Sequence, residues 1–347
     1  MFSCPSYLIL MLTNKCNLSC SYCYLGNNKA KKESGMDMPK VFIDRAILLL
    51  DSDQKSLHVQ LTGGEPFLVP GLVEYASFKI REKYPNASIG IQTNATLIND
   101  KAINIIEKFK LKLGISLDGE PPLQESQRGK ANDTFKGLHL LEQRKIPFNI
   151  TTVVTKENAD KLHRLVLMLG NFTMARGLGL DCLVLKGKAL ENSVLKADPD
   201  QIKSGIKNMV QALKMVNASR NIPLVIRELG KLNKIKQKHG TRFFCNGAMG
   251  NSLAVTPQGM LYPCSQTAFD PKFFLGALDP VKPDSVLSLN LSSKLEDYIL
   301  NIRTKEKCNN CDLNTQCPGD CPSRLYYNGK DGDELICTIY RSFYKSA

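Results

Sequence analysis

The sequence contains no long hydrophobic run, since no stretch of its 347 residues approaches the ~20 apolar residues of a membrane-spanning helix. An export signal is also missing. The opening MFSCPSYLILMLTNK has no basic start and no small-residue cleavage site, and its apolar run covers only about six residues. We therefore expect a first β-strand here rather than a signal peptide, no membrane partner and a cytoplasmic location.

Low-complexity tracts and sequence repeats are missing as well, and the first two thirds of the chain alternate between strand-like and helix-like segments. Helical spacing occurs in residues 39–51, 99–110 and 198–220. Short β-rich runs lie at residues 7–12, 57–62, 88–93, 111–117, 147–154 and 178–185. Six strand–helix units at this spacing predict an α/β fold with a parallel sheet covered by helices. The periodicity does not distinguish an open sheet from a partial barrel.

The character of the sequence changes in its last third. A basic stretch at residues 230–240 leads into a part that is rich in turns and cysteines. We therefore place a domain boundary within residues 225–240 and predict two domains, 1–228 and 229–347.

The chain has 46 Lys and Arg residues against 33 Asp and Glu residues, which gives a formal net charge of +13. This excess favours an acidic partner, such as an acidic peptide, a nucleic acid or an anionic cofactor. The lysines are scattered, however, as they are on an ordinary solvated surface, and we favour that simpler interpretation.

Twelve cysteines are the unusual feature of the composition, and ten of them fall into two groups more than two hundred residues apart. Cys4 and Cys182 stand outside these groups and are interpreted as small buried hydrophobic residues. Disulfides would suit a secreted chain, but without an export signal clustered cysteines favour metal binding in a reducing compartment.

The first group, Cys16, Cys20 and Cys23, has the spacing CxxxCxxC and follows the first predicted strand. In parallel α/β folds, ligands bind at this edge, where the carboxyl ends of the strands meet. Three thiolates can hold three irons of a cubane cluster and leave the fourth iron without a protein ligand. A zinc site with a borrowed fourth ligand, or simple buried thiols, are the alternatives.

Polar and glycine-rich motifs follow the next three strands. They are TGGEPF with Gly63, Gly64 and Glu65, QTNAT with Thr93 and Asn94, and SLDGE with Ser116 and Asp118. Glycines let the backbone approach a ligand, while a carboxylate and hydroxyls can take ammonium and ribose groups. Because all these loops should lie at the edge that carries the cysteines, we predict one shared site.

The chain resembles the radical S-adenosylmethionine (SAM) superfamily along essentially its whole length. The resemblance is carried by CxxxCxxC with an aromatic residue, Tyr22, before its last cysteine, and by the GGEP motif. It implies a partial (β/α)6 barrel in which an open iron of a [4Fe–4S] cluster chelates SAM. Reduction by a donor such as flavodoxin or ferredoxin then gives a 5′-deoxyadenosyl radical, which abstracts hydrogen from the substrate.

The same resemblance implies roles for individual residues. Glu65 and the Gly63–Gly64 backbone would hold the methionine amino group of SAM. Ser116 would meet its ribose, and Arg128 would lie near its carboxylate. Tyr22 and Asn94 complete the predicted cofactor-binding set.

The second cysteine group resembles the SPASM extension of these enzymes, which holds two auxiliary [4Fe–4S] clusters. The resemblance assigns one cluster to Cys245, Cys264 and Cys321, and the other to Cys308, Cys311, Cys317 and Cys337. An eighth cysteine that some relatives place shortly after the first of the seven is missing. The first auxiliary cluster is therefore expected to have an open iron, unless Asn251, Cys4, Cys182 or solvent fills the position. Two zinc-ribbon sites are the alternative.

The resemblance also bears on the substrate, because SPASM proteins mostly modify peptides by thioether or other crosslinks. Sulfatase maturases carry an aspartate directly after the cysteine matched by Cys264, whereas this chain has Ser265, which counts against that activity. With so few residues before the first strand, we expect no N-terminal leader-binding domain. The positive charge would suit an acidic leader.

Two other functions stay open at this stage. One is a radical SAM enzyme that matures a small cofactor precursor. The other, in a different class, is a zinc-stabilised nucleic-acid-binding protein, prompted by the cysteines and the charge. Nucleic acid is the least favoured partner.

Overall fold

A computed structural model describes residues 5–26, 35–50, 56–236, 243–281, 311–313, 317–329 and 334–346. Its strands form one sheet in the order β10-β9-β8-β1-β2-β3-β4-β5-β6-β7. They are β1 (Tyr7–Met11), β2 (His58–Thr62), β3 (Ser88–Thr93), β4 (Lys112–Ser116), β5 (Phe148–Val154), β6 (Ala175–Cys182), β7 (Val225–Ile226), β8 (Ser252–Val255), β9 (Met260–Tyr262) and β10 (Gly276–Ala277). Neighbours from β8 through β1 to β7 pair in parallel, and β9 and β10 pair antiparallel at one edge.

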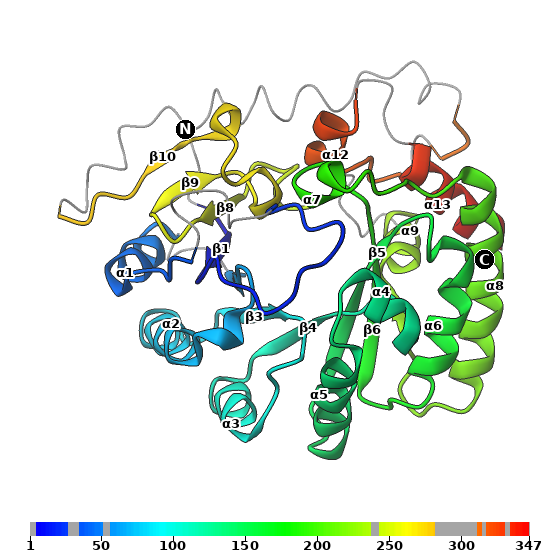
Figure 1. Ribbon diagram of the computed structural model, residues 1–347, viewed down its shortest axis with the longest axis horizontal. Coiled ribbons are helices and arrows are strands. Elements are labelled where there is room, and N and C mark those ends of the chain that lie inside the picture. Colours follow the sequence, from blue (N-terminus) through cyan, green and yellow to red (C-terminus); the bar gives the residue numbers. More distant parts are fainter. Residues whose placement is uncertain are drawn as a thin grey trace.

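The longer helices connect the strands and cover the outside of the sheet, as Figure 1 shows for α1, α2, α3 and α5. They are α1 (Lys40–Leu48), α2 (Pro70–Lys83), α3 (Asp100–Phe109), α4 (Pro121–Gln127), α5 (Ala131–Gln143), α6 (Leu162–Leu169), α8 (Pro199–Ala218), α9 (Arg227–Lys236) and α13 (Glu334–Ser346). Shorter helical segments are η2 (Pro66–Leu68), η3 (Ala159–Lys161), α7 (Lys188–Glu191), η4 (Ser265–Thr267), η5 (Pro271–Phe273) and α12 (Pro322–Tyr327). The predicted α/β fold with a parallel sheet core covered by helices is confirmed.

Helix α3 shows how local sequence sets these elements. The side chain of Asn99 caps its first turn by accepting a hydrogen bond from the Ala102 N–H (3.0 Å). Apolar residues at helical spacing, among them Ile103 and Ile106, are buried against the sheet. Lys110 ends the helix in the left-handed conformation, with φ of 53°.

The two faces of the sheet are packed differently. Leu8 and Leu10 of β1 belong to the large apolar core between sheet and helices, whereas Ile9 and Met11 alternate onto the other face. On that concave face several polar side chains lie over glycines of the next strand. A Cβ added at Gly90 would meet Oε1 of Gln60 at 2.5 Å, and one at Gly177 would meet Oδ1 of Asn149 at 2.6 Å. The interior of the barrel is therefore lined in part by polar groups.

The structure departs from the sequence prediction at β6, which begins at Ala175 and ends at Cys182 instead of covering residues 178–185. Its backbone pairs with β5 through Gly177 and Gly179, which carry no apolar side chain to mark a strand. Leu183 and Val184, which lie beyond the strand, line the cavity described below.

The C-terminal part continues the same sheet, because β8 pairs in parallel with β1 (Figure 1). The predicted boundary between residues 228 and 229 lies inside α9. The division into two domains stays a prediction.

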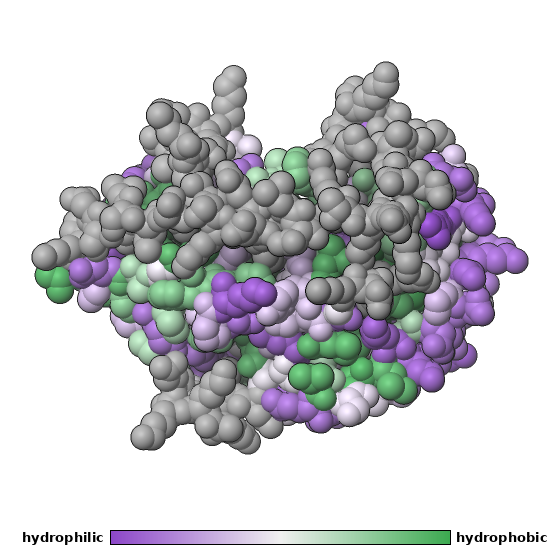
Figure 2. Space-filling view, turned by 90° about the horizontal axis from the view of Figure 1, so that it is seen from above, coloured by the Kyte–Doolittle hydropathy of each residue, from purple (hydrophilic) through white to green (hydrophobic). Residues whose placement is uncertain are grey.

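On the face seen in Figure 2, hydrophilic side chains gather along the right-hand edge, on the side where α8 lies in Figure 1. None of the helices that the structure describes is long and apolar enough to cross a membrane.

Candidate active site

A cavity of about 880 Å³ opens at the carboxyl ends of the barrel strands, around the loop that follows β1. It brings together all ten site residues predicted from the N-terminal motifs. They are Cys16, Cys20, Tyr22, Cys23, Gly63, Gly64, Glu65, Asn94, Ser116 and Arg128. Parallel strands place their carboxyl ends at one edge, so motifs up to about a hundred residues apart meet in one site.

The cysteine loop is held against the loop after β2 by backbone hydrogen bonds. The Gly64 N–H donates to the Thr13 carbonyl (2.7 Å), and the Glu65 N–H donates to the Lys15 carbonyl (2.8 Å). A Cβ at Gly64 would overlap the Lys15 carbonyl, and one at Gly63 would overlap that of Thr13. The two glycines therefore let the loop after β2 approach the cysteine loop. The sequence predicts a different role for them, which is to let the backbone approach a ligand.

The Gly64→Ala variant is expected to lose about 1–3 kcal/mol of stability, because its methyl group forces two backbone segments apart. It is also expected to bind less iron, since the displaced loop carries the cysteines. Gly71→Ala is a matched control: a Cβ there meets nothing within 4 Å, and Ala in helix α2 is neutral or favourable by up to about 1 kcal/mol. Urea denaturation and iron analysis of both variants check this prediction. Equal losses of stability and iron in the Gly64→Ala and Gly71→Ala variants would contradict this prediction.

Glu65 is a buried carboxylate, 1% exposed, that lines the cavity. It accepts hydrogen bonds from the Thr93 hydroxyl (2.7 Å), the Asn94 N–H (2.8 Å) and the Phe67 N–H (3.1 Å). Burial raises the pKa of Glu65, and these three donors oppose the shift. Among the residues that the structure describes, Oε2 accepts only the Asn94 hydrogen bond, so it has room for a further donor such as an ammonium group.

Asn94 ties the loop after β3 to the cysteine loop. Its Nδ2 donates to Oδ1 of Asn17 (3.0 Å), and Asn17 Nδ2 donates to the Thr96 hydroxyl (2.7 Å). Since Asn17 follows Cys16, this network fixes the backbone between the first two cysteines.

Asp118 is the centre of a second buried network beside the cysteine loop. It forms a two-point ion pair with Arg128, through Nε (2.8 Å) and Nη2 (3.1 Å). It also accepts hydrogen bonds from the Tyr22 hydroxyl and from the Val153 N–H (3.0 Å). The Arg128 guanidinium lies 5.2 Å from the centroid of the Tyr22 ring. The network thereby links β4, α4 and the cysteine motif.

This network keeps its groups in defined charge states. Burial raises the pKa of Tyr22 well above its ordinary value, so the phenol stays protonated and can donate. Burial lowers the pKa of Arg128, but the charge of Asp118, its hydrogen bond and the other neighbouring groups together outweigh burial, and the net shift is upward. Within the described part of the chain, Nη1 of Arg128 has no hydrogen-bond partner, and the residue lines the cavity.

A segment after β6 also supports the cysteine loop. The Lys188 N–H donates to the Cys23 carbonyl (2.9 Å), and Asn192 Nδ2 donates to the Ser21 carbonyl (2.7 Å). The Lys188 ammonium group also contacts the Ser19 hydroxyl. Sequence reasoning missed these residues, because they belong to no motif and lie more than 160 residues from their partners.

Three cysteines of the second group come together beside this cavity. A Cβ at Gly247 would lie 3.6 Å from Sγ of Cys245 and 3.9 Å from Cβ of Cys264. Burial, together with the nearby Cys321, raises the pKa of Cys245 to about 11 and also raises that of Cys264. Cys245 and Cys264 therefore stay protonated near neutral pH until a metal binds them.

The other predicted set is only partly described. Cys311, Cys317 and Cys337 come from three separate segments, and Cys308 and Cys4 lie outside the described residues. Among the described residues, no three His, Cys, Asp or Glu side chains are arranged to hold a single metal ion. The four-cysteine set stays a prediction.

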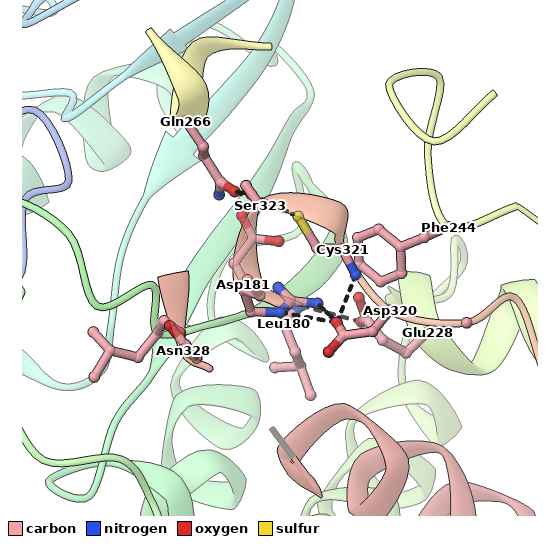
Figure 3. Close-up of polar contacts among 12 residues, drawn as sticks. Leu180, Asp181, Glu228, Phe244, Gln266, Asp320, Cys321, Ser323 and Asn328 are labelled. Atoms are coloured by element: carbon pink, nitrogen blue, oxygen red, sulfur yellow. Dashed lines mark hydrogen bonds and ion pairs between the residues drawn. The ribbon is translucent and has the colours of Figure 1, made fainter. Parts of the chain in front are cut away.

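Cys321 is anchored by a buried ion pair (Figure 3). Its N–H donates to Oδ1 of Asp320 (2.6 Å), and Arg324 donates to the same oxygen through Nη2 (2.5 Å) and Nε (3.0 Å). Arg324 is 1% exposed and lies 4.9 Å from the ring centroid of Phe244. This arrangement fixes the start of α12, where Cys321 is the residue before the helix.

Comparisons with known proteins define the class. The family model for the radical SAM superfamily matches residues 10–169. The uncharacterized protein MJ0907 of Methanocaldococcus jannaschii is 36% identical over 265 residues, which cover 74% of this chain and 84% of that protein. The cysteine-type anaerobic sulfatase-maturating enzyme of Clostridium novyi is 24% identical over 98% of this chain and 94% of its own length. The chain belongs to the radical SAM superfamily.

Solved structures show the same fold. Native anSMEcpe with bound AdoMet matches with a TM-score of 0.76 and 22% identity, over 98% of this chain and 96% of that chain. SuiB of Streptococcus suis bound to S-adenosylmethionine matches with a TM-score of 0.66 and 17% identity, over 93% and 74%. Both matches cover nearly all of this chain, so they extend beyond the part matched by the family model.

Proposed function

We propose that this enzyme binds a [4Fe–4S] cluster through Cys16, Cys20 and Cys23, with SAM beside it in the cavity. The observation that carries the proposal is that three thiols of one loop line the same cavity as polar groups from three neighbouring strand ends. An all-thiol donor set suits an iron–sulfur cluster. A volume of about 880 Å³ suits a cofactor with room for a substrate.

The chain's own groups are proposed to bind and orient SAM. Oε2 of Glu65 accepts from the amino group, the Ser116 hydroxyl meets the ribose, and Nη1 of Arg128 donates to the carboxylate. Asp118 holds Arg128 in place and, through Tyr22, also positions the cysteine motif. When bound, cluster and SAM supply one-electron cleavage of SAM and hydrogen abstraction from a substrate. An external donor such as flavodoxin or ferredoxin and a cytoplasmic location belong to this proposal.

We extend the proposal to the C-terminal part, residues 229–347, as a SPASM domain with two auxiliary [4Fe–4S] clusters. The proximity of Cys245, Cys264 and Cys321 supports the first of them. The second would be held by Cys308, Cys311, Cys317 and Cys337. Three cubane clusters correspond to roughly twelve irons per chain.

The proposed substrate is a peptide that receives a thioether or other crosslink. The neighbour anSMEcpe has been solved with a bound Cp18Cys peptide, and the fold is shared. Ser265, where sulfatase maturases carry an aspartate, favours a peptide other than a sulfatase. An acidic leader sequence is added to the proposal on the net charge of +13 alone.

Co-expression with short peptides encoded beside the gene tests the substrate class. We expect a change in peptide mass with the wild type and none with Cys20→Ala, measured by mass spectrometry after purification of the peptide. If the wild type cleaves SAM but leaves every such peptide unmodified, the peptide proposal fails and a small cofactor precursor is favoured. Colourless protein that contains zinc would instead favour the nucleic-acid-binding alternative.

A further inference from the structure

Asp181 and Arg227 line the cavity but come from other elements than the proposed SAM contacts. Asp181 is in β6, two residues after Gly179 and thus on the same face of the strand, and Arg227 begins α9. Glu65 follows β2 and Ser116 ends β4, and β5 lies between β4 and β6 in the sheet. The pair is therefore placed to contact a substrate beside SAM.

The Arg227 guanidinium is held in one orientation by its neighbours. Its Nε donates to Oε1 of Glu228 (2.7 Å). Its Nη2 donates to the Leu180 carbonyl (2.8 Å) and to Oδ1 of Asp181 (2.7 Å). Glu228 is 1% exposed, and its Oε2 accepts from the Leu180 N–H (3.1 Å; Figure 3). The guanidinium lies over Gly179, where a Cβ would meet its Cζ and Nη1 at 2.8 Å.

One donor and one acceptor of this ion pair are left over. Among the described residues, neither Nη1 of Arg227 nor Oδ2 of Asp181 has a hydrogen-bond partner. The side chains of Arg227 and Asp181 are 38% and 34% exposed. Burial raises the pKa of Asp181, but Arg227 and two further cations together outweigh burial and hold it below its usual value. The pair therefore offers the cavity two N–H groups and a carboxylate oxygen.

The charges around this pair balance. The carboxylates of Asp181 and Glu228 face the cations of Arg227 and Lys231, which are near enough to influence the pKa of Asp181. An ionic ligand would gain little net attraction from two charges of each sign. A neutral group with one hydrogen-bond acceptor and one donor would match both unused positions. The peptide backbone carries such groups, a carbonyl and an N–H, in each residue other than proline.

We propose that Asp181 and Arg227 bind the backbone of the peptide substrate, with Nη1 of Arg227 donating to a carbonyl and Oδ2 of Asp181 accepting from an N–H. This inference rests on the proposed peptide substrate. Backbone contacts are independent of side-chain identity, so the pair would position a peptide segment and leave the choice of the modified residue to other contacts.

The test uses a synthetic copy of a gene-adjacent peptide that the wild type modifies. Asp181→Asn keeps the shape of the side chain and turns the unused acceptor into an N–H donor when its oxygen stays on Arg227. We expect KM for the peptide to rise about 10- to 100-fold, with kcat and peptide-free formation of 5′-deoxyadenosine little changed. Asp200→Asn, at a side chain that is 93% exposed, is the matched control and should keep the wild-type KM.

A change in the peptide tests the same contact without altering the protein. Replacing single backbone amides by esters, one position at a time, removes one N–H from each peptide. At the position that Asp181 binds, the ester should raise KM for the wild type but add little in the Asp181→Asn variant.

The outcomes separate the two levels of the proposal. A wild-type KM in Asp181→Asn, or no ester position that raises KM for the wild type, would overturn the role of the pair alone. Loss of peptide-free SAM cleavage in Asp181→Asn would also overturn it, because the residue would then serve SAM. A wild type that cleaves SAM but modifies no peptide would overturn the peptide proposal and this inference with it.

Discussion

Replacing Asp118 by alanine is expected to lower the free energy of unfolding by about 3–5 kcal/mol. Asp118 is fully buried and Arg128 nearly so, with side-chain exposures of 0% and 9%. Removing the carboxylate leaves a buried guanidinium without its partner and deprives the Tyr22 hydroxyl and the Val153 N–H of their acceptor. The cost is therefore well above that of an ordinary surface ion pair.

A double-mutant cycle shows whether the loss of stability arises from the ion pair between Asp118 and Arg128. D118A/R128A should lose less stability than the sum of the two single variants, because no unpaired charge stays buried. Glu74→Ala breaks the exposed pair of Glu74 with Lys108 (2.8 Å) and should match the wild type within error. Urea titrations of the metal-free proteins provide the values. Additive losses, or a D118A variant as stable as the E74A control, would contradict the structural role of Asp118.

Replacing Cys20 by alanine is expected to remove one cluster of three. The variant should hold roughly eight irons where the wild type holds roughly twelve, since two thiols cannot retain a cubane that already lacks a fourth protein ligand. Cys182→Ala is the matched control, because Cys182 lines the same cavity but is assigned no metal. Iron and sulfide analysis after anaerobic reconstitution measures the iron and sulfide content per chain of each variant. Loss of iron from the Cys182 variant, or full retention in the Cys20 variant, would contradict the assignment.

The part of the site that sequence could predict is the part encoded in short motifs. Cys16, Glu65 and Ser116 each lie at or just beyond the end of a recognisable strand, and the geometry of a parallel sheet then places their loops at one edge. Five strands could be located in the same way, because each is a short apolar run between turn signals, whereas β6 begins three residues before its predicted start.

The part that sequence could not predict depends on contacts between distant segments. Gly63 and Gly64 are motif residues, but only the structure shows that they pack against the cysteine loop. Lys188 and Asn192 support that loop without belonging to any motif. The pairing of β8 with β1 is of the same kind, since nothing in residues 252–255 specifies a parallel partner some 245 residues away.

Reductive cleavage of SAM tests the central claim most directly. The reconstituted wild type, given SAM and dithionite without oxygen, should form 5′-deoxyadenosine, which liquid chromatography with mass spectrometry detects. In the Cys20→Ala variant the product should fall at least a thousandfold, to the level of the protein-free control, a loss of about 4 kcal/mol of transition-state stabilisation. Product formed equally by both proteins, or by neither when the wild type holds its full iron content, would contradict a SAM-cleaving cluster at Cys16, Cys20 and Cys23.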